Sequence, residues 1–140
     1  YDLAITDTSG IDELTAMNDV YMRDGNGFIF LYSVTSRVSF DGIAQFYERV
    51  VALKNRVSIP MVVVGNMIDI YTKRQVLFEE GEEIAKAMNC PFIEVSSKER
   101  TNVDFVFDSI IRAIDAEKVN DIQQANQVPK KSKFLKIFKN

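Results

Sequence analysis

The chain alternates short apolar runs with longer stretches in which apolar residues recur every three or four positions. The apolar runs are typical of strands, and we expect strands at residues 2–8, 27–34, 61–65 and 91–95. Two of them, GFIFLYSV and MVVVG, are almost continuously apolar, as strands are when both faces of a sheet are covered. The pattern therefore indicates a sheet that lies inside the molecule.

Stretches with helical periodicity separate these runs. The strongest runs from Val103 to Ile114, and Thr101 followed by Asp104 predicts a capping box at its start. Shorter helices are expected at residues 43–50, 84–88 and at the end of the polar segment 12–25, with Ser39 as the N-cap of the first. Strands interleaved with helices of this length predict an α/β fold with a doubly wound, mostly parallel sheet.

The amino-acid composition limits the kinds of catalytic and metal sites that the chain can form. Hydrophobic residues make up 46% and charged residues 26%, a globular balance, and no apolar run approaches the roughly 20 residues that cross a bilayer. The absence of histidine excludes a Ser-His-Asp triad and histidine-ligated zinc. The single cysteine, Cys90, excludes an intrachain disulfide and fits a reducing compartment. With no secretory leader in the sequence, we expect a cytoplasmic location.

The net charge of −3 is unevenly distributed. Residues 129–140 carry five lysines and no acid, and the lysines are Lys130, Lys131, Lys133, Lys136 and Lys139. Of the 17 basic residues, 12 remain upstream against 20 acidic ones, so the body of the chain carries about −8. This asymmetry indicates an acidic globule with a basic appendage rather than a nucleic-acid-binding face, and we expect no nucleic-acid partner.

Three polar loops follow three of the predicted strands: DTSG at residues 7–10, NMID at 66–69 and SSK at 96–98. In a doubly wound sheet, ligands bind beyond the carboxyl ends of the strands. Each motif alone is weak, since an Asn-x-x-Asp turn arises often by chance. The three together, in this order and at these positions, form a specific set.

This set resembles the Ras family of small GTPases, whose motifs DxxG, NKxD and SAK correspond to DTSG, NMID and SSK. The resemblance runs from Tyr1 to about Glu117. Segments similar to the Ras/Rap branch, more than to Rab, Rho or Arf proteins, are residues 16–28, 39–40 and 59–61. We accordingly expect a small GTPase domain of the P-loop type over residues 1–118, followed by a linker and basic tail over 119–140.

The resemblance implies a molecular switch in signal transduction that binds GDP and GTP with Mg²⁺ and hydrolyses GTP slowly. Its expected partners are exchange factors, GTPase-activating proteins and effectors. It assigns nucleotide contacts to six residues: Asn66, Met67, Asp69, Ser96, Ser97 and Lys98. Guanine presents two N–H donors on one edge, and the carboxylate of Asp69 can accept both.

The other contacts have physical reasons too. The Asn66 amide would bond the other edge of the base, and a backbone N–H near Ser97 would donate to the guanine carbonyl oxygen. The side-chain stems of Met67 and Lys98 would cover the ring faces. Plainer roles stay open: Asn66 and Asp69 as turn or capping residues, Met67 as loop packing and Lys98 as a solvated charge.

At the phosphate end, the resemblance places Mg²⁺ at Asp7, held through water. Gly10 lets its backbone N–H approach a terminal phosphate, which would order residues 9–24 with GTP and release them after hydrolysis. Ile11 stands where the family usually has a water-orienting glutamine, so hydrolysis is expected to be slow and to depend on partner proteins. A plain strand-end turn is the alternative for residues 7–10.

The phosphate loop GxxxxGK[ST] does not occur in the sequence, and by comparison with the family we expect it in roughly fifty residues before Tyr1. That piece would also supply a central strand, so we expect a sheet interrupted between residues 2–8 and 27–34, marginal stability, and weak or absent activity. One alternative is a pseudo-GTPase interaction module with little or no turnover, which Ile11 and Met67 favour. A weaker one is a membrane-surface adaptor.

The basic tail is the part of the chain for which we expect membrane binding. It lacks a C-a-a-X cysteine, so prenylation is not expected. On a helical wheel its apolar residues share one side, with lysines around the rest; they are Phe134, Leu135, Ile137 and Phe138. Each lysine contributes on the order of 1 kcal/mol near an acidic leaflet. We therefore expect weak, salt-sensitive binding of Lys130–Lys139 to anionic membranes, at the cytoplasmic face of the plasma membrane; a merely solubilising tail is the alternative.

Overall fold

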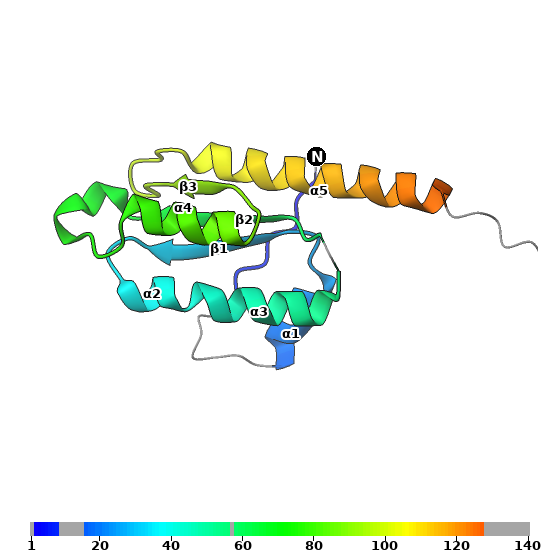
Figure 1. Ribbon diagram of the computed structural model, residues 1–140. Helices are drawn as coiled ribbons and strands as arrows, with labels where there is room; N and C mark the ends of the chain where they lie inside the picture. The colour runs from blue at the N-terminus through cyan, green and yellow to red at the C-terminus, as the bar shows by residue number, and fades with distance from the viewer. Residues whose placement is uncertain (1, 9–15, 57, 128–140) are drawn as a thin grey trace, which may run out of the picture.

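The computed structural model describes residues 2–8, 16–56 and 58–127. Its centre is a parallel sheet of β1 (Phe28–Ser33), β2 (Met61–Asn66) and β3 (Phe92–Glu94), in the order β1-β2-β3. The strands point the same way in Figure 1, so their carboxyl ends lie at one edge. The predicted α/β fold with a parallel sheet is thereby confirmed for the described part of the chain.

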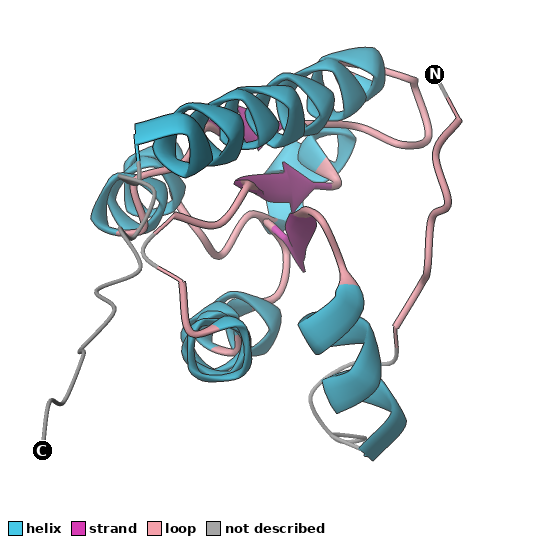
Figure 2. Cartoon of the chain, turned by 90° about the vertical axis from the view of Figure 1, so that its right-hand side faces the viewer, coloured by secondary structure: helices cyan, strands magenta, loops and turns pink. Residues whose placement is uncertain are grey.

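Helices cover both faces of the sheet, as Figure 2 shows. The long helix α5 (Val103–Gln127) packs on one face. The other face carries the shorter helices α1 (Ala16–Asp24), α2 (Arg37–Asp41), α3 (Ile43–Lys54) and α4 (Phe78–Ala87). A short 3₁₀ segment, η2 (Ile68–Lys73), follows β2 directly. Within the described residues, no helix combines the length and the apolar character needed to span a membrane.

The central strand β2 supplies the core to both faces. Its side chains alternate, because successive residues of a strand point to opposite sides. Val63 packs in the larger apolar cluster, with residues of α3 and α4, whereas Val62 and Val64 pack against α5 in the smaller one. All three valines are almost completely buried. The continuous apolar run MVVVG is thus explained by burial on both faces.

Two predicted elements at the ends of the domain differ in the structure. Residues 2–8 form no strand: they are exposed and have no ladder partner among the described residues, and an apolar run alone cannot supply one. The segment from residue 119, expected to be an irregular linker, begins as a helix, because α5 continues to Gln127. Arg56 forms ion pairs with Asp121 and Glu117 on this helix, which helps to hold its second half against the domain.

The predicted caps are shifted. Ser36, not Ser39, caps α2, and α3 begins directly after Gly42 with no side-chain cap. Ser39 lies inside α2, where its hydroxyl donates to the Ser36 carbonyl. Helix α5 begins at Val103, and Thr101, the expected N-cap, pairs through its backbone with Ser96 instead. The basic tail at 128–140 lies outside the described residues.

Tyr32 crosses the core beneath α4 and is only 2% exposed. Its hydroxyl has no hydrogen-bond partner among the described residues. A β-carbon on Gly81 of α4 would stand 2.4 Å from that hydroxyl oxygen and 2.3 Å from Cζ of Phe92. Burial raises the pKa of Tyr32 to about 12, and the Glu94 carboxylate adds to this. Glycine at position 81 is therefore what allows α4 to lie so close to the sheet.

We expect Tyr32→Phe to raise the free energy of unfolding at neutral pH by about 1 kcal/mol, because it removes a buried hydroxyl without a partner. It should also flatten the alkaline pH dependence. The folded protein holds the phenol proton up to a pKa of about 12, above the usual 10. The stability that this gives is complete below pH 10 and is lost as the pH rises toward 12.

Urea unfolding at pH 7 and between pH 10 and 12 measures both effects. The matched control is Tyr71→Phe at an exposed tyrosine, which should change stability by less than about 0.5 kcal/mol. A loss of stability in Tyr32→Phe at pH 7 would mean that the hydroxyl has a hydrogen-bond partner, such as a buried water.

Candidate functional site

The candidate site lies at the carboxyl ends of the three strands, where the NMID and SSK loops meet. The two loops are joined through the backbone: the Val95 N–H donates to the Gly65 carbonyl at 2.8 Å, and the Ile68 N–H to the Val95 carbonyl at 3.3 Å. The parallel register sets Ser33 of β1 opposite Asn66 of β2. Segments distant in sequence are thereby brought to one edge of the sheet.

Asn66, the last residue of β2, is the hub of this arrangement. Its side-chain Oδ1 accepts from the Met67 N–H at 2.8 Å, the Ser97 N–H at 3.0 Å and the Ser97 hydroxyl at 3.1 Å. Two of these donors are backbone N–H groups, so the accepting atom must be the oxygen of the amide. The Nδ2 donor has no partner among the described residues and is available to a ligand.

Asp69 lies in the first turn of η2. Its Oδ1 accepts from the hydroxyl of Ser96 at 2.8 Å, and that hydroxyl in turn accepts from the Glu99 N–H at 3.1 Å. Ser96 is completely buried, so the hydroxyl is a fixed point that orients the carboxylate. Among the described residues Oδ2 has no partner. A carboxylate has about four acceptor positions, which leaves room for two further N–H donors.

Met67 has a left-handed backbone, with φ 69° and ψ 32°, which is uncommon for a residue other than glycine. The side chain is 38% exposed, and its sulfur accepts a hydrogen bond from the Ser33 hydroxyl at 3.1 Å. The Thr35 hydroxyl lies 4.0 Å from the same sulfur and 2.7 Å from the Ser33 hydroxyl. Met67 is therefore tethered to the end of β1.

Ser33 and Thr35 were not among the residues predicted from the sequence. The signal for them was available: Ser33 is the second-last residue of the GFIFLYSV run and Thr35 follows it, and this run is also a strand with its carboxyl end at the edge where ligands bind in such sheets. A thioether is a weak hydrogen-bond acceptor, and nothing in a sequence pattern pairs it with two hydroxyl groups 34 and 32 residues away.

The remaining predicted residues are less closely connected. Lys98 is exposed in the turn after β3, next to Ser97. Asp7 is exposed in the segment 2–8 and does not stand at a strand end, because that segment is not part of the sheet. Gly10 and Ile11 lie outside the described residues. In the part of the chain that the structure describes, no cluster of three acidic, cysteine or histidine side chains could hold a metal.

A family model described as the Ras family matches residues 1–116, most of the chain. The chain belongs to the Ras family of small GTPases. Ras-like protein 1 of Saccharomyces cerevisiae is 45% identical over 124 residues, which cover 87% of the chain and 40% of that protein.

Two proteins of Dictyostelium discoideum are also similar. Ras-like protein rasW is 46% identical over 114 residues, 81% of the chain and 53% of that protein. Ras-like protein rasZ is 36% identical over 141 residues, 97% of the chain and 66% of that protein. The chain spans about half the length of the first two relatives, 40% and 53%. The resemblance stated from the motifs is thus confirmed at the level of the Ras family.

The role of Asn66 in joining the two loops of this Ras-family chain can be tested by measuring the free energy of unfolding and the hydrogen exchange of backbone amides. Asn66→Ala removes the acceptor for two backbone N–H groups and should lower the free energy of unfolding by roughly 1–3 kcal/mol. Hydrogen exchange at the Ser97 amide should accelerate at the same time. Asn66→Asp keeps an acceptor oxygen and should preserve the protection of that amide.

Asn26→Ala, at an exposed loop asparagine, is the matched control and should leave the Ser97 amide unchanged. If that amide exchanges equally fast in the native chain and in Asn66→Ala, then Asn66 does not join the two loops.

Proposed function

We propose that this protein binds guanine nucleotides, GDP and GTP with Mg²⁺, as a molecular switch of the Ras type. The proposal is carried by two polar side chains that lie at the same edge of the sheet. Asn66 and Asp69 are each held by a hydrogen bond from the SSK loop, and each has a polar atom without a partner among the described residues. Membership of the Ras family supports the same assignment.

The free groups match the edges of guanine. Asp69, oriented by Ser96, accepts the two N–H donors of the base in a charge-assisted pair. The Nδ2 group of Asn66 donates to the opposite edge. Buried hydrogen-bonding groups discriminate strongly, because the wrong base leaves them without partners.

The backbone N–H that donates to the guanine carbonyl oxygen can be assigned to a single residue. The Ser97 N–H already donates to Asn66 and the Glu99 N–H to Ser96. The N–H of Lys98 lies between them in the same turn, and we assign the contact to it. The Lys98 stem and the tethered side chain of Met67 then cover the two ring faces of the base.

The phosphate end of the proposal rests on the sequence. Asp7 would hold Mg²⁺ through a bound water, and the backbone N–H of Gly10 would donate to the terminal phosphate. Mg²⁺ neutralises phosphate charge when it is bound. Isoleucine at position 11 cannot hydrogen-bond an attacking water, so GTP hydrolysis is slow and depends on GTPase-activating proteins, with exchange factors and effectors as the other partners.

Titration of the full-length protein with fluorescent GDP tests guanine recognition. Asp69→Asn should weaken GDP binding by roughly 10- to 100-fold, because charge-assisted hydrogen bonds contribute on the order of 1.5–3 kcal/mol. The same variant should gain affinity for xanthosine diphosphate. Xanthine carries a carbonyl where guanine carries an amino group, and an asparagine amide can donate to it.

Asp104→Asn, an equal change at an exposed residue of α5, should leave GDP affinity unaltered. Equal affinity of the native protein for ATP and GTP would overturn the assignment of Asp69. So would an Asp69→Asn variant that binds GDP as tightly as the native protein.

A further inference from the structure

The end of β1 carries two hydroxyl groups that have no role in the nucleotide contacts proposed above. Ser33 and Thr35 stand on either side of Val34, and their hydroxyl oxygens are 2.7 Å apart. Oγ of Ser33 also lies 3.1 Å from the sulfur of Met67, 34 residues further along the chain. Two hydroxyl groups and one thioether thus form a short row of polar atoms beside the NMID loop.

The hydrogen bonds in this row have one direction. A hydroxyl group has one proton and two lone pairs, and a thioether sulfur has no proton to donate. The contact of 3.1 Å between Ser33 and the sulfur therefore uses the proton of Ser33. In the pair of hydroxyl groups, Thr35 must then be the donor, and its backbone N–H also donates to Oγ of Ser33, at 3.2 Å. Thr35 thus orients the hydroxyl of Ser33 toward the sulfur of Met67.

The backbone of Ser33 is held on both sides. Its N–H donates to Oγ of Ser39 at 3.0 Å, and its carbonyl accepts from the Ser36 N–H at 3.0 Å. The next residue, Val34, is completely buried, and its N–H donates to the Asn66 carbonyl at 2.9 Å. The hydroxyl that contacts the sulfur therefore projects from a backbone that is fixed to the end of β2.

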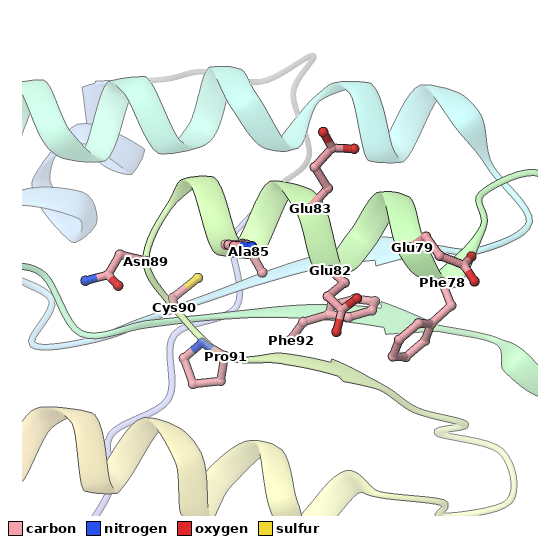
Figure 3. A pocket seen from close by; sticks show the side chains of 10 residues that line it. Phe78, Glu79, Glu82, Glu83, Ala85, Asn89, Cys90, Pro91 and Phe92 are labelled. Carbon is pink, nitrogen blue, oxygen red and sulfur yellow. The ribbon is translucent and has the colours of Figure 1, made fainter.

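The side chain of Met67 depends on such a contact to keep one position. It is 38% exposed, and methionine is unbranched with three rotatable bonds. An exposed phenylalanine of α4, Phe78, is restrained in another way: its ring lies against that of Phe92, with 5.1 Å between the centroids, in the hollow between α4 and β3 (Figure 3). Ordering a flexible side chain costs conformational entropy, so a ligand binds more tightly when that side chain is already ordered.

We propose that Ser33, oriented by Thr35, is a positioning residue for guanine nucleotide binding. It acts through Met67: the hydroxyl of Ser33 holds the sulfur, and the thioether side chain is thereby fixed against one face of the base. This role rests on the proposed function and extends it to a residue outside the nucleotide contacts. Because every base has an apolar face, the contribution of Ser33 is the same for purines that differ in their edges.

The dissociation rate of fluorescent GDP from the full-length protein tests this role. Ser33→Ala removes the donor to the sulfur and should speed dissociation by roughly 3- to 10-fold, the range expected for the loss of one hydrogen bond. Ser33→Thr retains a hydroxyl group and should restore the native rate. Ser58→Ala, at an exposed serine before the amino end of β2, is the matched control and should have no effect.

A double-mutant cycle shows whether Ser33 acts through Met67. Met67→Leu keeps an apolar side chain of similar size without the sulfur, and it should speed dissociation as much as Ser33→Ala does. Adding Ser33→Ala to Met67→Leu should change the rate no further. In Phe78→Leu, an apolar exchange at another exposed residue, Ser33→Ala should keep its full effect.

Two results of this cycle overturn the proposal. One is a native dissociation rate in Met67→Leu, a variant that leaves Ser33 and its backbone contacts intact. The other is an equal effect of Ser33→Ala with and without the sulfur, which would mean that the serine acts through the turn after β1. Circular dichroism shows that each variant is folded.

A base analogue separates this contact from that of Asp69. Inosine diphosphate lacks the amino group that Asp69 is proposed to bind but has a similar ring face. In competition with fluorescent GDP, Ser33→Ala should weaken GDP and inosine diphosphate by the same factor, whereas Asp69→Asn should weaken GDP more. A native protein that binds neither nucleotide overturns the proposed function and the role of Ser33 with it. Native binding with an unchanged rate in Ser33→Ala overturns the role of Ser33 alone.

Discussion

One side-chain oxygen holds the functional edge of this domain together. Oδ1 of Asn66 accepts from the residue that follows it and from both donors of Ser97, thirty-one residues further along the chain. Without it, the described contacts between the loops after β2 and β3 would be those of the backbone and of Ser96. Because the oxygen takes up the structural role, the nitrogen of the same amide has no partner among the described residues. One asparagine thereby braces the loops and keeps a donor available for the nucleotide contact proposed above.

The sequence pattern predicted the layered α/β fold and the parallel sheet because burial on both faces of β2 leaves a continuous apolar run. It failed where stability comes from contacts between distant residues. Residues 2–8 have a strand-like sequence but pair with no strand in the part of the chain that the structure describes. The second half of α5 is supported by Arg56, which no local periodicity reveals. The choice between Ser36 and Ser39 as a cap could not be made either, since both precede apolar residues at helical spacing.

Within the candidate site, the positions of Asn66, Asp69 and Ser96 at strand ends predicted that they lie together, because parallel strands bring their carboxyl ends to one edge of the sheet. The tether of Met67 was not predictable. A family lysine at this position would bring a cation, and a sulfur atom held by Ser33 is a weaker link of a different kind. The role of each residue toward a nucleotide remains proposed, while the arrangement of their hydrogen bonds is a property of the fold.

The absence of a side chain at Gly81 has an effect that extends to the outer surface of α4. A single methyl group there would meet both the phenol of Tyr32 and the ring of Phe92. Either the two rings would have to shift or the helix would have to lift from the sheet, and in the second case its outward-facing glutamates would move with it. The packing of α4 on the sheet and the positions of its surface carboxylates are therefore linked. A substitution among the buried residues would alter the charged surface of this helix.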